Sequence, residues 1–135
     1  MKFCKFFVFV LLYREILFRG KTVCDGDWVY GGITWNPSRK KFFIHTDWEE
    51  AKVIPETVGQ YTGLTDENGV KIFEGDILHT AQGDFVVRWS ESICSFVAGE
   101  KERMRPCMNS GTMKYCEVIG NIYDNPELTK EAEKI

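Results

Sequence analysis

Turn-forming residues at short, regular intervals are the feature of this sequence that most restricts its fold. Residues 57–76 read TVGQYTGLTDENGVKIFEGD, in which apolar and polar residues alternate between glycines. Asn68 and Gly69 supply the left-handed backbone conformations that a tight hairpin turn requires. After them, Val70 and Ile72 alternate with polar neighbours, which gives a strand one buried face and one wet face. Because no helix is expected after the glycines, the segment predicts a hairpin and not a phosphate-binding loop.

Turn-forming residues recur along the rest of the chain. Turn compositions occur at residues 25–27, 36–39 and 82–84, and short apolar stretches lie between them. Aromatic residues make up 14% of the chain, a content that favours strands. The pattern predicts a mainly β fold, with an antiparallel meander over residues 13–54 packed against a small barrel-like half over residues 55–135. At 135 residues, the two halves are expected to form a single domain.

The two ends of the chain carry different signals. Near the C-terminus, Asn125 is expected to cap a short helix that has Pro126 at its first position. Near the N-terminus, residues 6–12 form an apolar run that is too short to span a bilayer and is followed by no small-residue cleavage site. Residues 1–12 are therefore expected to be a non-native or disordered extension.

Charge and cysteine content exclude several classes of function. The net charge of −3 gives no general attraction to nucleic acid. The five cysteines are Cys4, Cys24, Cys94, Cys107 and Cys116, and no two of them are separated by only two residues. This spacing is typical of neither a zinc ribbon nor a redox motif, so no metal and no cofactor is expected. Isolated, reduced thiols indicate a reducing compartment, which here means the cytoplasm.

A hydrolytic site would have to use the two histidines of the chain. His45 stands in FFIHTDWEE, beside acidic residues, and His79 lies in a separate predicted strand. A histidine at a strand end next to a solvated acidic connector explains the first motif without catalysis. Cys107 and Cys116 show no spacing that pairs them with either histidine. The sequence therefore predicts a non-enzymatic protein, and a hydrolase is the least favoured of three functional hypotheses.

Two groups of basic residues are candidate partner-binding surfaces. The first combines a basic turn with an aromatic residue: Arg39, Lys40, Lys41 and Phe42. The second lies in the polar loop of residues 99–112 and consists of Lys101, Arg103 and Arg105. Small β-barrels bind single-stranded nucleic acid with such basic and aromatic groups. Solvated loops have the same composition, however, and loops on rigid scaffolds often carry binding sites of other kinds.

A third candidate is a recognition groove formed by Gln60, Tyr61 and Thr62. These polar residues stand between Gly59 and Gly63 in a predicted strand. Polar side chains in such a position either line a groove or satisfy one another's hydrogen bonds inside the fold, and the sequence leaves both interpretations open.

Five blocks of sequence carry a family resemblance. They are REILFRGK (14–21), GDWVYGGI (26–33), PETVGQYTGLTDENGVKIFEGDIL (55–78), VVRW (86–89) and VIGNIYDNPELT (118–129). In this order and spacing, the blocks resemble the YopX-like proteins, which are encoded by phages and prophages of low-GC Gram-positive bacteria. The resemblance implies a mainly β protein from a mobile genetic element, and it supplies no catalytic residues.

The start of the chain departs from the family pattern. YopX-like proteins typically begin with a methionine at, or one residue before, the position of Arg14. Here an apolar segment precedes that position. We expect translation of the natural protein to start near Leu12, so that residues 1–11 would not belong to it.

The leading functional hypothesis is a phage or prophage accessory protein that binds a host or phage protein through exposed strand edges and the loop of residues 99–113. The second hypothesis is a nucleic-acid-binding module that uses residues 39–43 and the basic loop. No membrane association is expected, and the expected location is the cytoplasm of the bacterial host.

Overall fold

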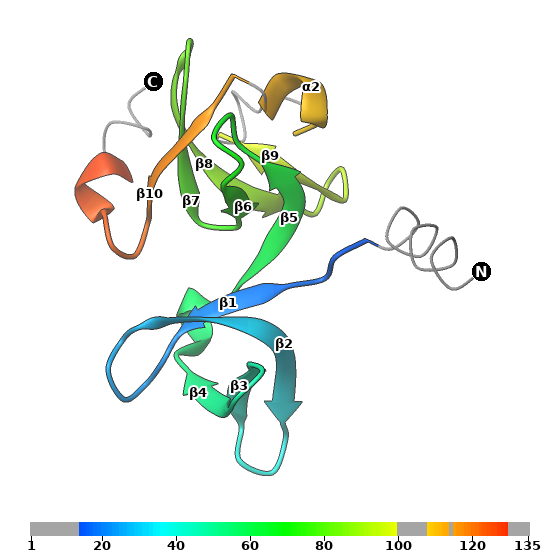
Figure 1. The fold of residues 1–135 in the computed structure, drawn as a ribbon, viewed down its shortest axis with the longest axis vertical. Helices are drawn as coiled ribbons and strands as arrows, with labels where there is room; N and C mark the ends of the chain where they lie inside the picture. Colours follow the sequence, from blue (N-terminus) through cyan, green and yellow to red (C-terminus); the bar gives the residue numbers. More distant parts are fainter. Residues whose placement is uncertain (1–13, 100–107, 114, 130–135) are drawn as a thin grey trace.

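The computed structural model describes residues 14–99, 108–113 and 115–129, which form two β lobes stacked one above the other (Figure 1). The strand β5 (Gly59–Thr65) runs from the lower lobe into the upper lobe, which also contains the short helix α2 (Ser110–Met113). The predicted N-terminal extension, residues 1–12, lies outside the described residues. Within the described part, no helix is long and apolar enough to cross a bilayer.

Six strands form the first sheet: β4 (Glu50–Val53), β3 (Lys41–His45), β2 (Trp28–Asn36), β1 (Phe18–Lys21), β5 and β6 (Lys71–Phe73), in this spatial order. All of these pairings are antiparallel. Gly31 permits a close approach within the sheet, because a Cβ atom there would lie 1.8 Å from the His45 carbonyl oxygen. Any larger residue at this position would push β2 and β3 apart.

The outer edge of β4 is partly covered by the chain that follows β1. Thr22 forms a bridge with Val53, and the Val23 N–H donates to the Lys52 carbonyl at 3.0 Å. These bonds occupy backbone groups that an added strand from a partner would need. The β4 edge is therefore not one of the exposed strand edges that the sequence-based hypothesis requires.

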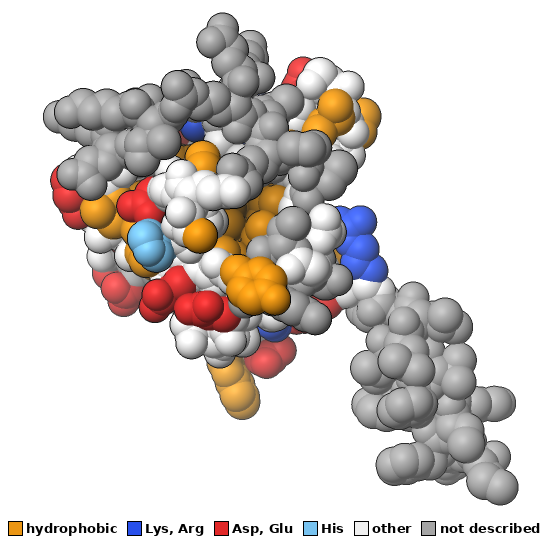
Figure 2. All heavy atoms as spheres, turned by 90° about the horizontal axis from the view of Figure 1, so that it is seen from above, with side chains coloured by type: hydrophobic (Ala, Val, Ile, Leu, Met, Phe, Trp, Pro, Cys, Tyr) orange, Lys and Arg blue, Asp and Glu red, His pale blue; other side chains and the backbone are white. Residues whose placement is uncertain are grey.

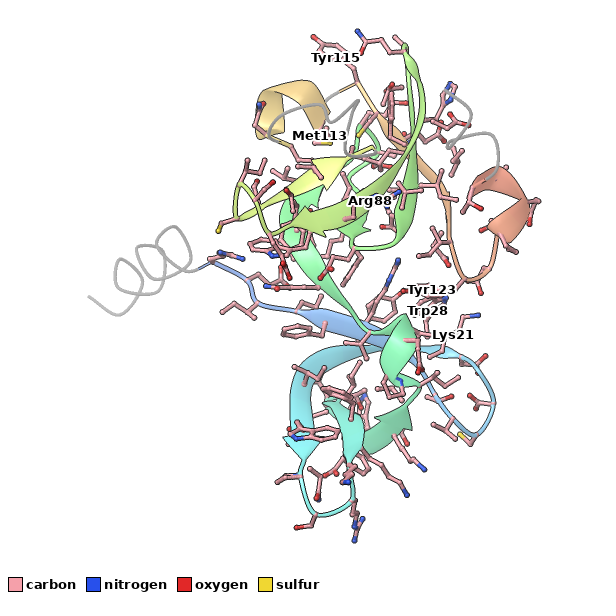
Figure 3. The ribbon with its side chains drawn as sticks, turned by 180° about the vertical axis from the view of Figure 1, so that it is seen from behind. Lys21, Trp28, Arg88, Met113, Tyr115 and Tyr123 are labelled. Atoms are coloured by element: carbon pink, nitrogen blue, oxygen red, sulfur yellow. The ribbon has the colours of Figure 1, made fainter. Side chains whose placement is uncertain are left out.

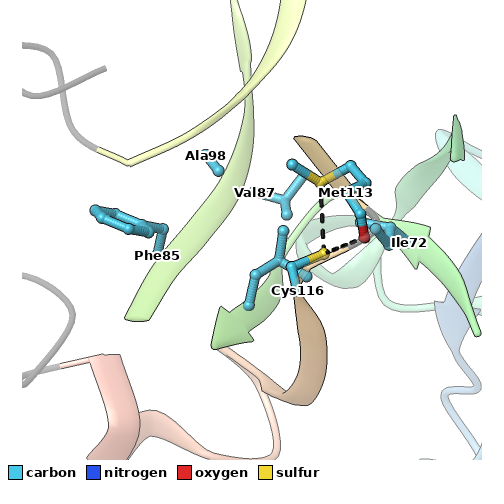
Figure 4. Packing of buried hydrophobic residues seen from close by; sticks show 7 residues of the cluster. Ile72, Phe85, Val87, Ala98, Met113 and Cys116 are labelled. Atoms are coloured by element: carbon cyan, nitrogen blue, oxygen red, sulfur yellow. Dashed lines mark hydrogen bonds between the residues drawn. The ribbon is translucent and has the colours of Figure 1, made fainter. Parts of the chain in front are cut away.

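Four strands form the second sheet: β10 (Glu117–Asn121), β7 (Asp76–Thr80), β8 (Gly83–Ser90) and β9 (Ser95–Ala98), in this spatial order and all antiparallel. Apolar side chains from β6, β7, β8, β9 and the α2 region form its core (Figure 4), namely Ile72, Leu78, Phe85, Val87, Ala98, Met113 and Cys116. Removing this apolar surface from water is the main force that holds the upper lobe together.

Asp66 organises the hairpin turn that the sequence predicts between β5 and β6. Its carboxylate is only 5% exposed and accepts the N–H groups of Asn68, Val70 and Val118, each at 2.9 Å. The first two bonds close the turn, and the third attaches β10 to it. Gly69 has a φ of +78°, as predicted, but Asn68 is not in the left-handed region, so that part of the prediction is wrong. The Asp66 carboxylate supplies the closure instead.

The predicted mainly β, antiparallel fold with a short C-terminal helix is confirmed. The described strands form two sheets without a closed barrel, so the barrel-like half is an open four-stranded sheet packed on a hairpin. Residues 126–129 are helical, and the Asn125 carbonyl accepts the Leu128 N–H at 3.0 Å. The Asn125 side chain, which is expected to cap this helix, accepts the Asn121 N–H at 3.2 Å. The prediction of a single domain with halves at residues 13–54 and 55–135 stays a prediction. β5 pairs within the first sheet and also runs into the upper lobe.

A buried ion pair joins the two lobes. Arg19 of β1 donates from Nη2 to Asp76 Oδ1 at 2.7 Å, and the two side chains are only 7% and 2% exposed. The same nitrogen donates to the Glu74 carbonyl at 3.2 Å. The guanidinium lies over the rings of Trp28 and Phe73, at 4.6 and 4.9 Å from their centroids. Burial raises the pKa of Asp76, while the Arg19 charge acts in the opposite direction.

A second contact between the lobes lies at the turn after β10, where Lys21, Trp28 and Tyr123 come close together (Figure 3). Asp124 forms an ion pair with Lys21 and accepts the Trp28 Nε1–H at 2.7 Å and an Asn121 amide N–H at 3.1 Å. The Tyr123 and Trp28 rings are 5.9 Å apart. These donors, Lys21 first, lower the pKa of Asp124 to about 2. The C-terminal turn is thus attached to the lower lobe by a charged carboxylate.

Arg19→Met is expected to destabilise the protein strongly, because Asp76 would remain buried without a counter-charge. Breaking a buried ion pair in this way costs about 3–5 kcal/mol. Adding Asp76→Asn removes the isolated charge, so the double variant should be more stable than Arg19→Met alone. Urea unfolding measures both effects. Lys71→Met is the control because the interactions it removes, an ion pair with Glu15 and a contact with the Tyr61 ring, involve an exposed ammonium group, and it should cost about 1 kcal/mol or less. A double variant less stable than Arg19→Met would contradict the expectation.

Asp124→Asn is expected to lose stability in a pH-dependent way. The folded pKa of Asp124 is depressed from 3.8 to about 2, so its charge favours the folded state above 3.8, and this contribution disappears as the pH falls through 2. The difference in unfolding free energy between wild type and Asp124→Asn should therefore be largest at neutral pH and shrink between these two values. Denaturant unfolding across that range is the measurement, and a difference that does not change with pH would refute it.

Candidate functional site

Four predicted partner-binding residues gather at the end of the β2–β3 hairpin. Arg39 and Lys40 lie in the turn, and Lys41 and Phe42 begin β3. The Asn36 side chain accepts the Arg39 N–H at 3.0 Å, which fixes the turn. Lys40 has a φ of +52°, a left-handed conformation that is less costly for glycine or asparagine than for lysine.

Trp35, which sequence reasoning missed, adds an aromatic surface to this hairpin end. It pairs with Phe42 across the two strands, with ring centroids 4.8 Å apart. Trp35 remains 47% exposed, so Phe42 supports the ring while much of it faces solvent. The position of the hairpin turn could have predicted the pairing of Trp35 with Phe42, because residues equidistant from a turn face each other across the two strands.

Lys52 is a second residue that sequence reasoning missed, and it comes from β4. The register places it opposite Phe43. The like charge of the nearby Lys41 side chain lowers the pKa of Lys52. No ion pair in the described part of the chain includes a basic residue of this hairpin end. We define the basic tip as Trp35, Arg39, Lys40, Lys41, Phe42 and Lys52.

Strand alternation divides the basic tip between two faces of the sheet. Lys41 and Lys52 share one face, whereas Trp35 and Phe42 share the face that also holds the fully buried Ile44. The turn that contains Arg39 and Lys40 joins the two faces. The tip therefore offers positive charge on one side and an exposed aromatic ring on the other.

The other end of β3 carries a fully exposed tryptophan. Trp48 is 94% exposed, although its backbone is fixed. Thr46 Oγ1 accepts the N–H groups of Trp48 and Glu49 at 3.2 and 3.0 Å, and the Thr46 N–H donates to the Glu49 carbonyl at 2.9 Å. Asp47 and Glu50 complete an acidic surrounding. We call residues 46–50 the Trp48 turn; its DWEE sequence was interpreted only as a polar connector.

The residues of the predicted groove are engaged inside the fold. Tyr61 is only 6% exposed, and Thr62 Oγ1 donates to the Ile72 carbonyl at 2.8 Å. The Gln60 N–H donates to the Glu74 carboxylate at 3.0 Å. The three residues adjoin one another on β5, and a binding role for them stays a prediction. Four other predicted or considered residues lie outside the described part of the chain: Lys101, Arg103, Arg105 and Cys107.

The titratable groups that the structure describes do not assemble into a catalytic site. His79 Nδ1 lies 2.6 Å from Asp84 Oδ1 on the surface, and His45 Nε2 lies 2.6 Å from Thr34 Oγ1. Cys116 is 1% exposed, and burial raises the pKa of its thiol, which disfavours the nucleophilic thiolate. Within the described residues, no three potential metal ligands come together. The expectations of no enzymatic activity and no cofactor stay predictions.

A groove of about 440 Å³ opens where the C-terminal turn meets β8. It is lined by Val58, Glu74, Gly75, Val86, Val87, Arg88, Ile122, Tyr123 and Thr129. Figure 3 shows Arg88 above Tyr123, which stands next to Trp28. Its ionisable and hydroxyl-bearing lining residues are Glu74, Arg88, Tyr123 and Thr129.

The fold and these surfaces define a class of protein: a small β scaffold of two lobes, with exposed aromatic and charged groups on its turns. The chain belongs to the YopX family, since the family described as YopX protein matches residues 19–130. The resemblance seen in the sequence blocks is thereby confirmed.

A solved structure shares this architecture. The chain is similar to the crystal structure of protein EF1440 from Enterococcus faecalis, with a TM-score of 0.58 and 22% sequence identity over 86% of this chain and 99% of that chain. At this level of identity the likeness shows the fold alone. No curated protein matches the chain significantly.

Lys52→Gln is expected to raise the melting temperature, because it removes the repulsion between two adjacent ammonium groups. The folded pKa of Lys52 lies below 10.5, so the repulsion destabilises the fold at neutral pH and disappears as the pH rises through the lowered pKa toward 10.5. The advantage of the variant should therefore shrink at alkaline pH. Thermal unfolding at neutral and at alkaline pH measures this advantage. Lys71→Gln is the control, and it should lower the melting temperature at neutral pH because Lys71 pairs with Glu15. A lower melting temperature for Lys52→Gln at neutral pH would show that the two lysines do not repel.

Proposed function

We propose that the protein is a non-enzymatic binding module that attaches to a partner protein through the Trp48 turn. The observation that carries the proposal is the 94% exposure of Trp48 on a backbone whose N–H groups at Trp48 and Glu49 donate to Thr46 Oγ1. Tryptophan is highly buried on average, and it is enriched among the few residues that supply most of the binding energy of protein interfaces. A turn that is already rigid loses little conformational entropy when a partner covers it.

The charges around Trp48 indicate the chemistry of the partner. Asp47, Glu49 and Glu50 flank the indole ring. Glu50 has the His45 ring at 3.8 Å, and no ion pair of the described residues includes Asp47 or Glu49. A complementary surface would present an apolar pocket for the indole and a basic rim for the carboxylates. Such charge complementarity speeds association and selects the partner.

The sequence-based version of this hypothesis relied on strand edges and on the loop of residues 99–113. The β4 edge is hydrogen-bonded to Thr22 and Val23, and residues 100–107 lie outside the described part of the chain. The Trp48 turn is therefore the surface that the contacts support best. Membership in the YopX family supports the further proposal of a phage or prophage origin, with a host or phage protein as partner in the bacterial cytoplasm.

Trp48→Ala is expected to weaken partner binding by about 2 kcal/mol or more, the loss typical of a dominant interface residue. Tagged wild type and variant are purified from bacteria that carry the phage, and the retained protein is identified by mass spectrometry. That protein is then produced separately and titrated against both chains by calorimetry. Urea unfolding should give equal stabilities for the two chains within about 0.5 kcal/mol, since Trp48 is 94% exposed among the described residues.

Tyr115→Ala is the matched control, because Tyr115 is another strongly exposed aromatic residue, at 77%, and lies outside the Trp48 turn. It should leave the dissociation constant unchanged. A partner that binds wild type and Trp48→Ala equally, or that is lost equally in both variants, would rule out recognition through this turn.

A further inference from the structure

A second binding surface lies at the opposite end of β3 from the Trp48 turn. We infer that the basic tip binds single-stranded nucleic acid, with Arg39, Lys41 and Lys52 on the phosphates and Trp35 stacked on a base. This inference does not depend on the protein-binding proposal, because the two surfaces share no residue. Four independent observations support it.

The first observation is uncompensated charge. The tip contains four basic residues and no acidic one, although the whole chain has a net charge of −3. The ion pairs of the described residues involve other cations, namely Arg19, Lys21, His45, Lys71 and His79. Cations gathered without counter-charges form the electrostatic footprint of a phosphate backbone.

The second observation is the placement of Lys41 and Lys52 on one face of the sheet by the pairing register. Their like charges repel each other in the free protein. A phosphate oxygen placed between them would accept a charge-assisted hydrogen bond from each lysine and turn the repulsion into attraction. The free protein is therefore already arranged for an anion at this position.

The third observation is the conformation of Lys40. Its φ of +52° lies in the left-handed region, where glycine and asparagine fit with less strain. A basic residue nevertheless occupies this point of the turn, between Arg39 and Lys41. The Lys40 side chain thus adds an exposed charge in the turn that joins the two faces of the tip.

The fourth observation distinguishes nucleic acid from other polyanions. Trp35 is 47% exposed and rests on Phe42, so it can offer a rigid ring to an unpaired base. Base stacking on aromatic residues is a general feature of single-strand recognition, whereas an acidic peptide has no regular series of flat rings. A duplex keeps its bases inside the stack, which favours a single strand.

Viewed from above, acidic side chains of the described residues line one side of the molecule (Figure 2). A nucleic acid strand that crosses the turn of the basic tip can keep its phosphate backbone on the face of Lys41 and Lys52. It can then turn a base toward Trp35 on the other face. The two faces of the tip would then be used together.

The test is fluorescence anisotropy of a labelled twelve-nucleotide oligothymidylate, titrated with the full chain at several salt concentrations. Contacts from these three cations should make log Kd rise with log salt concentration with a slope of about 2. The double variant Lys41→Gln/Lys52→Gln should weaken binding at low salt and reduce that slope by about 1.4. It should fold at least as well as wild type, because it removes a repulsion. Trp35→Ala should weaken binding about fivefold or more and leave the slope unchanged.

The matched control is Arg14→Gln/Arg88→Gln, which removes the same charge from two exposed arginines outside the tip and should leave the slope unchanged. Equal losses in the two double variants would show a mere net-charge effect and overturn the inference. Absence of binding at low salt would overturn it as well. So would a duplex or a polyglutamate peptide that binds as tightly as the oligothymidylate. Trp48→Ala should bind the oligonucleotide like wild type. The same variant should bind the partner protein more weakly, so the two proposals can fail independently of each other.

Discussion

The buried pair between Arg19 and Asp76 is the interaction on which the arrangement of the two lobes depends. Removing both charges from water is costly, and the cost is offset only when the lobes meet and the 2.7 Å contact forms. Arg19 Nε is buried without a hydrogen-bond partner, and the rings of Trp28 and Phe73 on the guanidinium faces compensate in part. Such a pair contributes less to net stability than to the choice of one docked arrangement over others, a role that the surface contact of Asp124 could not fulfil alone.

The fold was predictable from sequence wherever local chemistry determines the backbone. The left-handed φ of Gly69 follows from residue type. In β8, alternation accounts for only part of the burial, because Val86 is buried together with Phe85 and Val87. The Arg19–Asp76 pair was not predictable, because the two residues are 57 positions apart and nothing local distinguishes a buried charge from a solvated one. Long-range contacts of this kind determine how the sheets pack.

The candidate sites divide in the same way. The run of Arg39, Lys40 and Lys41 was visible as composition, and the structure adds Lys52 from a neighbouring strand through the pairing register. The exposure of Trp48 was not visible, because a tryptophan in a polar segment is as compatible with docking on the core as with projection into water. Only the tertiary packing shows that nothing in the described part of the chain covers it.

The two proposed surfaces lie at opposite ends of one five-residue strand, β3. On the neighbouring strand β4, Lys52 of the basic tip and Glu50 of the Trp48 turn are only two residues apart, so the two surfaces adjoin on one face of the sheet. The strand between them is rigid, because Ile44 is fully buried and both neighbouring strands pair with β3. Occupation of both surfaces at once would bring the partner protein and the nucleic acid strand close together on one rigid element, without a conformational change in the lobe.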